Sequence, residues 1–411
     1  MKITPVKGTN DYLPAQAELR NYLQKKICET YEQAGFQRIA TPIIEDIENL
    51  DKSEGGDNLN LIFKVMKRGE KLKKAIASQN PDNIADMGLR YDLTLPLSRY
   101  YANNRASLPQ PFKVIQMDRV YRAERPQKGR LREFIQCDIL GSDSSTCEIE
   151  LIHTTAKALL NIGINNFKVK INDRRILREI LLSVGFEEDQ LDSVCISFDK
   201  LNKIKAEGVE AELTEKGFDK AVIAEFMKLL SNAPFTLDYV KEICKNSEYV
   251  DSLAYIIDTS NALADGKYVA EYDMTLVRGQ GYYTGTVFEV ESLDFNSSIA
   301  GGGRYDNLIG KFLKEQIPAV GFSIGFERIY SILMEKESYN TEKQKKVVLI
   351  YEEDQVADAI RYAEELRKTY KTALYIKPKK LGKFLNKLEE QGFDGFQVFG
   401  RDEEVRMFGE Q

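Results

Sequence analysis

A short basic segment between two predicted strands is the feature that most constrains the fold. Residues 119–134, RVYRAERPQKGRLREF, carry six cations and two acids in sixteen positions, although the chain has a net charge of −6. The flanking stretches FKVIQMDRVYRAE and LREFIQCDI predict two strands joined by the loop RPQKGR. Such a hairpin binds phosphate if its arginines point into a cleft, because the planar guanidinium makes paired bonds to phosphate oxygens. The alternative at this point is a solvated hairpin with ordinary surface charge.

The bulk composition excludes several other kinds of protein. A length of 411 residues, 43% of them hydrophobic and 30% charged, is typical of a soluble chain with two or three domains. No run of 18 apolar residues predicts a membrane span, and the opening MKITPVKGTNDYLP lacks the apolar core of a secretory signal. The five dispersed cysteines are expected to be reduced thiols in a cytosolic chain. The single histidine, His153, excludes multi-histidine zinc sites, disfavours Ser-His-Asp catalysis, and is expected to be an ordinary helix residue.

Apolar periodicity divides the chain into strands, helices and a separate tail domain. Residues 15–33 predict a helix that ends before Gly35, and Pro42 in the next extended segment predicts a strand at an edge or an interface. Helical patterns are expected at about 145–162 and 175–262, with the strand FKVKIN between them, and strands resume at LVRGQGYYTGTVFEVES. The polar run 334–346 is interpreted as a linker, and the alternation after it predicts a small α/β domain with a mostly parallel sheet.

Three further stretches contain residue types suited to an anionic ligand. Arg278 stands in the otherwise apolar strand entry TLVRGQGYYTGTVFEV, where an unpaired guanidinium would be costly. IAGGGRYDNLIG has three consecutive glycines, which allow a ligand to approach the backbone closely. AVGFSIGFERI places Glu327 and Arg328 at the start of an apolar helix. Neither glycine cluster matches a dinucleotide fingerprint or a P-loop.

Taken in order, these stretches resemble the motifs of the histidyl-tRNA synthetase family of class II aminoacyl-tRNA synthetases. GTNDYLP is similar to the family's opening signature, FQRIATPIIE to class II motif 1, and FKVIQMDRVYRAERPQKGRLREF to motif 2. LVRGQGYYTGTVFE and AGGGRYD resemble the two histidine-family motifs, and GFSIGFERI resembles motif 3. The resemblance covers nearly all of 1–332 and, more loosely, 346–411. It implies an α+β fold: a class II antiparallel-sheet catalytic domain at 1–174 and 263–333, a helical insertion at 175–262, a linker at 334–346 and a shortened α/β anticodon-binding-like domain at 347–411.

The resemblance also implies an ATP-dependent histidine–tRNA ligase that works in two steps. The carboxylate of histidine attacks the α-phosphate of ATP and pyrophosphate leaves, and a terminal ribose hydroxyl of tRNA(His) then attacks the adenylate. Fixed cations would stabilise the charge that builds on the phosphorane. By resemblance, Arg122 bridges the substrate carboxylate and the α-phosphate, Arg278 lies on the opposite side of that phosphate, and Arg328 lies near the γ-phosphate.

The remaining expected ATP contacts belong to the motif 2 segment. By resemblance, Glu124 reads the adenine amino group, Phe134 stacks on the adenine ring, and Arg130 is a further contact. Mg²⁺ would bridge the phosphates with few protein ligands, so no separate protein metal site is expected.

The resemblance assigns the amino-acid contacts to three stretches. Asp92 and Thr94, with Gln136, would bind the ammonium group of histidine, while the imidazole would face the tyrosines Tyr282, Tyr283 and Tyr305. For each tyrosine the alternative is core packing with a satisfied hydroxyl.

The sequence departs from the family pattern at the position that reads the imidazole. The family usually has an acid four residues after the glutamine, where this chain has Leu140, but the run QCDILG is two residues shorter than usual. If the deletion precedes that position, Asp138 takes the place of the acid and shares a strand face with Gln136. If Leu140 is the equivalent, the preference for histidine is in doubt, because only a buried polar partner discriminates by roughly 10⁴–10⁵. Gly281 also stands where the family often has an acid.

The tail and the quaternary state complete the expectations. The end FGRDEEVRMFGEQ is shorter than a usual anticodon-binding domain, and KPKKLGK (Lys377, Lys379, Lys380 and Lys383) forms a basic cluster that either contacts tRNA phosphates or is a solvated turn. A cytoplasmic homodimer that binds no membrane is expected. Two alternatives remain open: a non-catalytic, histidine-sensing regulatory subunit of ATP phosphoribosyltransferase, and a catalytic paralogue that activates another amino acid.

Overall fold

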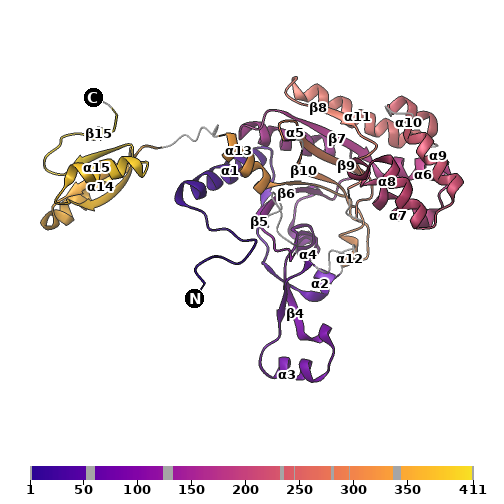
Figure 1. Cartoon of the computed structure of the whole chain (residues 1–411), viewed down its shortest axis with the longest axis horizontal. Coiled ribbons are helices and arrows are strands. Elements are labelled where there is room, and N and C mark those ends of the chain that lie inside the picture. The colour runs from indigo at the N-terminus through magenta and orange to yellow at the C-terminus, as the bar shows by residue number, and fades with distance from the viewer. Residues whose placement is uncertain are drawn as a thin grey trace. The chain divides into compact units, whose positions relative to one another are not determined.

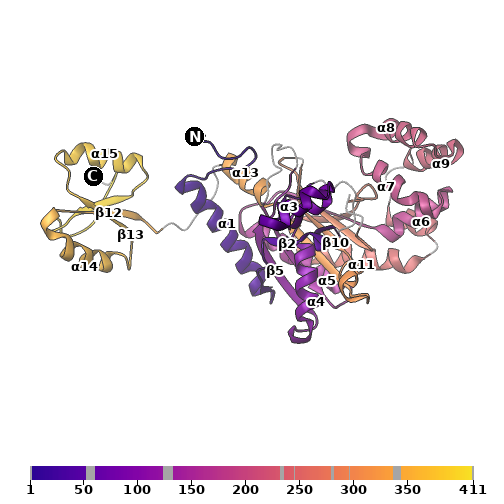
Figure 2. The same cartoon turned by 90° about the horizontal axis from the view of Figure 1, so that it is seen from below.

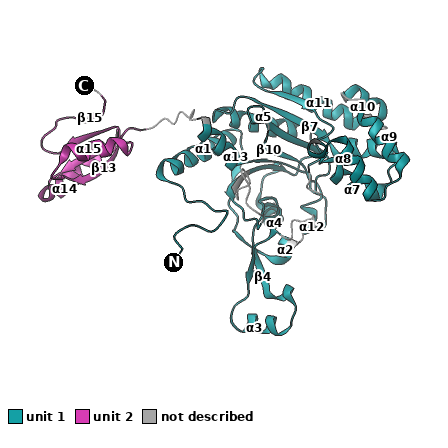
Figure 3. Cartoon of the chain, in the orientation of Figure 1, with its two compact units in different colours: residues 1–339 teal, residues 340–411 magenta. Residues whose placement is uncertain are grey.

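The chain forms two compact units, residues 1–339 and 340–411, which Figure 3 distinguishes by colour. The structure is a computed structural model that describes residues 2–51, 61–123, 133–231, 236–244, 246–278, 282–295, 297–336 and 344–409. Each unit has its own sheet and its own apolar core. The two are therefore described one at a time.

A mainly antiparallel sheet forms the centre of the first unit (Figure 1). In the described part of the chain it has eight strands in the order β1-β5-β6-β11-β10-β9-β7-β8. The outermost pairs β1–β5 and β7–β8 are parallel, and the pairs between them are antiparallel. The predicted α+β fold is confirmed. The strands are β1 (Gln37–Arg38), β5 (Phe112–Arg119), β6 (Glu133–Leu140), β7 (Phe167–Asp173), β8 (Val269–Tyr272), β9 (Thr286–Ser292), β10 (Ser297–Arg304) and β11 (Ala319–Ile324).

Long helices cover one face of this sheet. They are α1 (Pro14–Gln33), α5 (Thr146–Asn161), α11 (Ser247–Ala264) and α13 (Phe326–Lys336). The predicted stripe of α1 is buried, with Leu19, Leu23, Ile27 and Tyr31 each at most 1% exposed. Gly35 follows the helix with φ +85°, a conformation that glycine adopts without strain. His153 lies in α5, as predicted.

On the opposite face, the described residues include two helices, α4 (Thr94–Asn104), which has as many residues as α13, and α12 (Gly310–Leu313), and these two contact each other. Their apolar cluster includes Leu97, Tyr101, Phe112, Leu140 and Ile309. Polar side chains on this face, Gln116, Gln136 and Asp138, are also buried. This face is therefore where a polar ligand would meet the sheet.

A second, three-stranded sheet forms an arm that projects from the body of unit 1 (Figure 1). Its strands lie in the order β2-β4-β3, which makes β2 an edge strand. The single extended segment predicted around Pro42 is divided into β1 and β2, and Pro42 lies between these strands. The elements of the arm are β2 (Ile44–Asp46), α2 (Ile47–Asp51), β3 (Lys64–Met66), α3 (Gly69–Ala77) and β4 (Ala85–Leu89).

A fully buried arginine joins the arm to the large sheet. Arg90 follows β4 and is 0% exposed. Its Nη1 donates to the carbonyl of Thr41 (2.7 Å), its Nε donates to the carbonyl of Arg119 (2.9 Å), and its Nη2 pairs with Asp118 Oδ2 at 2.6 Å. Asp118 and Arg119 end β5, and Arg119 is also the first residue of the basic segment. Arg90 therefore holds the end of β5 at which that segment begins.

Helices fill the chain between β7 and β8 (Figure 2). They are α6 (Arg174–Val184), α7 (Leu191–Phe198), α8 (Leu201–Glu215), α9 (Lys220–Ser231), α10 (Leu237–Ile243) and α11. The sequence did not indicate β8 after them, because four residues are too few for a period to be read. In the described residues, no helix is both long enough and apolar enough to cross a bilayer.

The strand predicted from Leu276 onward begins ten residues later. Leu276–Arg278 and Tyr282–Gly285 are not in a strand, and β9 starts at Thr286. Arg278 has φ +56°, a left-handed conformation that a β-strand does not accommodate. The aromatic and apolar residues that suggested a strand here are held by side-chain contacts instead.

The second unit is a small α/β layer structure. β12 (Lys346–Tyr351) pairs parallel with β13 (Lys371–Ile376) and β14 (Gly395–Val398), and β15 (Arg406–Met407) pairs antiparallel with β14. The mostly parallel sheet predicted for the tail is therefore confirmed. One apolar cluster joins β12 to α15 (Leu381–Glu390) and another joins it to α14 (Val356–Leu366). The polar run 334–346 overlaps the end of α13 and the first residue of β12, and residues 337–343 lie outside the described residues.

Replacement of Arg90 by methionine is expected to destabilise unit 1. Arg90→Met keeps the apolar volume but leaves the carbonyls of Thr41 and Arg119 without their donor and Asp118 without its cation. The free energy of unfolding, measured by urea denaturation, should fall by about 3 kcal/mol or more. Arg361→Met, at an exposed pair, should change it by less than about 0.5 kcal/mol. An equal, small effect of both substitutions would contradict the role given to Arg90.

Candidate active site

Seven predicted amino-acid-binding residues lie together on the face of the large sheet that carries α4 and α12. This sheet-face cluster consists of Asp92, Thr94, Gln136, Asp138, Tyr282, Tyr283 and Tyr305. β6 supplies Gln136 and Asp138, which point to the same face because side chains alternate along a strand. Thr94 Oγ1 donates to Gln136 Oε1 (3.1 Å), and the Gln136 amide bonds the Asp138 carboxyl. Thr94 begins α4, and the amide of Leu95 donates to Asp92 Oδ1 at 3.2 Å.

Asp138 and Leu140 lie two residues apart on one face of β6, and the polar contacts belong to Asp138. Asp138 is 1% exposed, and its Oδ1 accepts a hydrogen bond from the hydroxyl of Tyr305. Leu140 packs in the apolar cluster that includes Leu97, Tyr101 and Tyr305. Both side chains therefore lie near Tyr305, Asp138 by a hydrogen bond and Leu140 by apolar packing.

Burial raises the pKa of the Asp138 carboxyl from 3.8 to about 7. Hydrogen bonds from Tyr305 and Gln136 oppose this rise, while the nearby charge of Asp92 adds to it. Burial also raises the pKa of Asp92 to about 6, against the amide of Leu95 and the positive charge of Arg122. Two neighbouring carboxyls with raised pKa values on one sheet face are typical of a site that binds a cation.

The tyrosines pack against one another and against the carboxyls. The ring of Tyr282 lies 4.8 Å from that of Tyr283 and 6.1 Å from that of Tyr305, centroid to centroid. Burial and the neighbouring Tyr283 and Asp92 raise the pKa of Tyr282. The three tyrosine rings lie together next to Asp138. This placement is compatible both with core packing and with contact to a ligand.

Arg122 reaches the sheet-face cluster from the end of the β5 segment. Its Nε donates to the carbonyl of Tyr91 at 2.9 Å, and its backbone bridges to Ile62. Its guanidinium lies close enough to Asp92 to lower the pKa of that carboxyl. The first of the predicted catalytic arginines is thus adjacent to the predicted ammonium site.

Arg278 contacts the same cluster through Tyr283. Its Nη1 pairs with Glu289 Oε2 at 3.2 Å, and it bonds the hydroxyl of Tyr283. Burial lowers the pKa of Arg278, but the neighbouring Tyr283 and Glu289 outweigh burial, so the pKa is raised. Contacts through Asp92, Tyr282 and Tyr283 therefore link Arg122 to Arg278.

Arg328 contacts β10, a strand that Arg278 also contacts. It is half-buried in the first turn of α13, and its Nη1 donates to the carbonyl of Ser298 in β10. Ser298 precedes Gly301 by three residues, and a Cβ at Gly301 would lie 1.9 Å from Nη1 of Arg278. Arg278 and Arg328 both contact β10. Glu124, Arg130 and Gly281 lie outside the described residues, and Phe134 belongs to β6 without a described side chain.

The glycine run makes room for side chains of the site. A Cβ at Gly303 would lie 2.9 Å from the ring of Tyr283, and one at Gly321 would lie 2.0 Å from Asp138 Oδ1. The sequence suggested that these glycines allow a ligand to approach the backbone. In the structure, side chains of the chain itself occupy that space: the Arg278 guanidinium at Gly301, the Tyr283 ring at Gly303 and the Asp138 carboxyl at Gly321.

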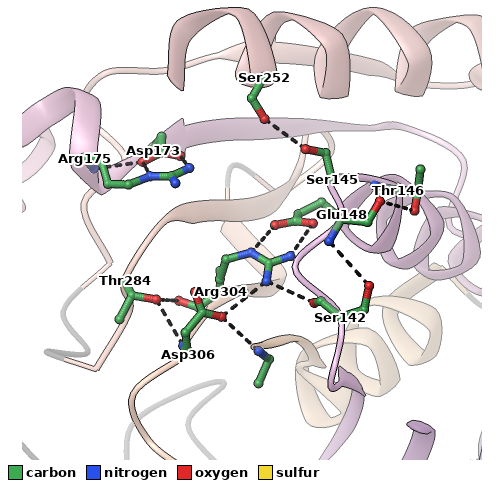
Figure 4. Close-up of polar contacts among 12 residues, drawn as sticks. Ser142, Ser145, Thr146, Glu148, Asp173, Arg175, Ser252, Thr284, Arg304 and Asp306 are labelled. Carbon is green, nitrogen blue, oxygen red and sulfur yellow. Dashed lines mark hydrogen bonds and ion pairs between the residues drawn. The ribbon is translucent and has the colours of Figure 1, made fainter. Parts of the chain in front are cut away.

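Sequence reasoning missed the ion pair that supports the segment Tyr282–Gly285 (Figure 4). Arg304 at the end of β10 forms a buried, two-pronged pair with Glu148 of α5, at 2.7 and 2.8 Å. The carbonyl of Arg304 accepts the amide of Thr284 (2.8 Å), and Thr284 Oγ1 accepts the amide of Asp306 (3.1 Å). Arg304 thus holds the segment that carries Tyr283 and the strand end that carries Tyr305. The arginine stood in the quoted stretch AGGGRYD, but nothing in the sequence indicated Glu148 as its partner.

No cluster of three or more His, Cys, Asp or Glu side chains in the described residues could hold a metal ion. Glu289 is the carboxylate found beside Arg278. The donor set therefore fits a divalent cation that arrives on a polyphosphate and takes most of its ligands from phosphate and water.

Comparison with known proteins identifies the family. The family model described as "Histidyl-tRNA synthetase" matches residues 8–329. The chain belongs to the histidyl-tRNA synthetase family. Among curated relatives, it is 41% identical to the "Histidine--tRNA ligase" of Leifsonia xyli subsp. xyli over 85% of this chain and 84% of that protein. It is 34% identical to the "Histidine--tRNA ligase" of Cytophaga hutchinsonii over 97% of this chain and 92% of that one.

Solved structures give the same family fold. The crystal structure of histidyl-tRNA synthetase from Nostoc sp. PCC 7120 matches with a TM-score of 0.79 and 26% identity, over 96% of this chain and 91% of that one. A structure titled "ATP phosphoribosyltransferase regulatory subunit/histidyl-tRNA synthetase" from Bacillus halodurans matches with a TM-score of 0.76 and 20% identity, over 97% of each chain. The second likeness shows the fold alone.

Asp138→Asn is expected to flatten the dependence of stability on pH. Because the pKa of Asp138 rises from 3.8 to about 7 on folding, the folded chain keeps a proton that the unfolded chain releases between about pH 4 and pH 7. Stability contributed by the neutral carboxyl is therefore present below pH 4 and is lost as the pH rises through 7. Between pH 4 and pH 8 the wild type should lose on the order of 2–4 kcal/mol more unfolding free energy than the variant.

Urea denaturation of the ligand-free protein at a series of pH values measures this difference. Asp358→Asn, which alters an exposed carboxyl, should keep the wild-type profile. Parallel profiles for the wild type and Asp138→Asn would show that the Asp138 carboxyl is not buried as described.

Proposed function

We propose that the protein is an ATP-dependent histidine–tRNA ligase. The observation that carries this proposal is the convergence of Arg122, Arg278 and the sheet-face cluster in a chain that belongs to the histidyl-tRNA synthetase family. An amino-acid site formed by carboxyls lies directly against a pair of arginines. This arrangement supports the joining of an amino acid to a phosphate group at one place.

The sheet-face cluster would bind histidine by both of its polar ends. Asp92, Thr94 and Gln136 would receive the ammonium group, and Asp138 would accept a hydrogen bond from the imidazole, with Tyr282, Tyr283 and Tyr305 around the ring. The burial of Asp138 supports this role, because a polar group that is 1% exposed discriminates against amino acids that cannot form a hydrogen bond with it. Leu140 would have no such role.

The arginines would stabilise the first chemical step. A carboxylate oxygen of histidine attacks the α-phosphorus of ATP, the bond from phosphorus to the bridging oxygen breaks, and pyrophosphate leaves with that electron pair. Arg122 and Arg278 would hold the equatorial oxygens of the phosphorane, and Arg328 would hold the γ-phosphate. Glu124, Arg130 and Phe134 are proposed contacts to ATP, and Mg²⁺ would neutralise charge on the phosphates. A terminal ribose hydroxyl of tRNA(His) then attacks the acyl carbon, and AMP leaves.

The second unit would contact the tRNA. Lys377, Lys379, Lys380 and Lys383 are all exposed. Lys380 and Lys383 line a surface hollow of about 590 Å³ together with Phe384 and Lys387. Cations beside an aromatic ring are suited to a backbone phosphate and an unpaired base.

We also propose that the enzyme acts as a cytoplasmic homodimer. Ile43, Ile44 and Met66 on the arm are 41%, 50% and 61% exposed, and β2 is an edge strand. Exposed apolar side chains next to an open strand edge are suited to a partner surface. Sedimentation of the full chain measures the oligomeric state directly.

The two alternative functions make different demands on the site. A regulatory subunit would bind histidine without needing Arg122 and Arg278 beside it, and its support is a likeness of fold at 20% identity. A paralogue for another amino acid would be favoured if only an apolar residue faced the tyrosines, but Asp138 lies on the same strand face as Leu140 and bonds Tyr305. Both observations favour the ligase.

ATP–pyrophosphate exchange with each amino acid separates these functions. Exchange with histidine alone is expected; exchange with another amino acid would support the paralogue, and histidine binding without exchange would support the regulatory subunit. Arg278→Ala should reduce the exchange rate by roughly 10²–10³, by analogy with the loss of a donor from an oxyanion hole, and should not alter the oligomeric state. Arg361→Ala, at the exposed pair with Asp358, is the matched control. Undiminished exchange by Arg278→Ala would refute the role of Arg278.

A further inference from the structure

The opening signature GTNDYLP is the one motif that the proposed mechanism leaves without a role. Of residues 2–13, only Gly8 and Tyr12 are not exposed. The ring of Tyr12 lies 6.0 Å from that of Tyr330 in α13, edge to face, and its hydroxyl lies 3.5 Å from Glu327 Oε2. The segment therefore contacts α13 through Tyr12.

A second residue of the N-terminal region binds Glu327 more closely. Arg20 of α1 donates from Nη1 to Glu327 Oε2 (2.8 Å) and from Nη2 to Oε1 (2.6 Å). Both side chains are 6% exposed. The Arg20 guanidinium also lies over three aromatic rings, those of Tyr12 (4.1 Å), Phe326 (4.9 Å) and Tyr330 (5.1 Å). The carboxylate of Glu327 is thus bound by a guanidinium that itself lies against three aromatic rings.

This buried ion pair is next to a residue of the ATP site. Glu327 precedes Arg328 in the first turn of α13, and consecutive helical side chains point about 100° apart. Any rotation of α13 about its axis would move both. With Glu327 held by α1, Arg328 is directed to the carbonyl of Ser298 in β10, the strand that Arg278 also contacts. A buried ion pair is weak evidence for stability, because desolvation offsets much of its attraction, but it does favour one arrangement over others.

We propose that Arg20 and Tyr12 are positioning residues for ATP: they hold Glu327 and thereby orient Arg328 toward the γ-phosphate. The inference rests on the proposed function, because it takes Arg328 as a contact of ATP. It assigns the opening signature to the nucleotide and not to histidine.

Binding of ATP and of histidine to the full chain, each measured by calorimetry, tests the proposal without requiring activity. Arg20→Lys keeps the charge but loses the two-pronged pair and the stacking. It should weaken ATP binding about tenfold and change histidine binding less than twofold. Tyr12→Phe, which removes only the hydroxyl, should weaken ATP binding by about two- to threefold. Lys25→Met alters an exposed position of the same helix and should change neither.

A double-mutant comparison separates orientation of Arg328 from a general loss of structure. Arg328→Ala should weaken ATP binding, and in that background Arg20→Lys should add less than a twofold effect, because the group that it orients is gone. Thermal unfolding of each variant checks that the chain is folded. If Arg20→Lys fails to fold, Tyr12→Phe and Glu327→Gln provide the same comparison.

The outcomes distinguish failure of the positioning role from failure of the proposed function. Equal weakening of ATP and histidine binding by Arg20→Lys, or a full additional loss in the Arg328→Ala background, would overturn the positioning role. Unchanged ATP affinity in Arg328→Ala alone would instead refute the assignment of Arg328 to the ATP site. An Arg20→Lys protein that binds ATP like the wild type, while Arg328→Ala does not, would leave the proposed function intact and remove the inference.

Discussion

The burial of charged side chains in and around an antiparallel sheet is the constraint on which the rest of the structure depends. A buried carboxyl or guanidinium is costly unless it has a partner with good geometry. Asp138 has Tyr305, Arg278 has Glu289 and Tyr283, and Arg304 has Glu148. In each pair the partners come from different elements. The contacts that pair these buried charges therefore also bring the residues of the candidate site together.

The same constraint explains the small residues in the sheet. Gly301, Gly303 and Gly321 stand where a Cβ would collide with Arg278, Tyr283 and Asp138. The glycines are in β10 and β11, neighbouring strands, and the side chains that use the space come from other segments. Arg278 itself has φ +56°, and such strained backbone is common at functional sites. The three glycines and the strained backbone of Arg278 thus occur together where polar side chains pack against the sheet.

The sequence allowed the prediction of elements with a strong period, such as α1, β6 and the alternating tail. It also supplied the proposed residues of the site, because their order resembles a family. It could not indicate partners that are distant in the chain, such as Glu148 for Arg304 or Arg20 for Glu327, since no local pattern relates them. The Leu276–Arg278 segment was wrongly predicted as strand, because the apolar residues that contact the core there resemble those of a strand. The surroundings of Asp138 and Leu140 needed the register of β6 with β11, which places Asp138 opposite Gly321.

A crystal structure with a non-hydrolysable histidyl-adenylate analogue tests the central claim most directly. The account predicts that the guanidinium groups of Arg122 and Arg278 lie on opposite sides of the phosphate mimic, and that an imidazole nitrogen lies about 3 Å from a carboxylate oxygen of Asp138. An analogue whose imidazole faces Leu140, or whose phosphate mimic lies away from both arginines, would contradict it.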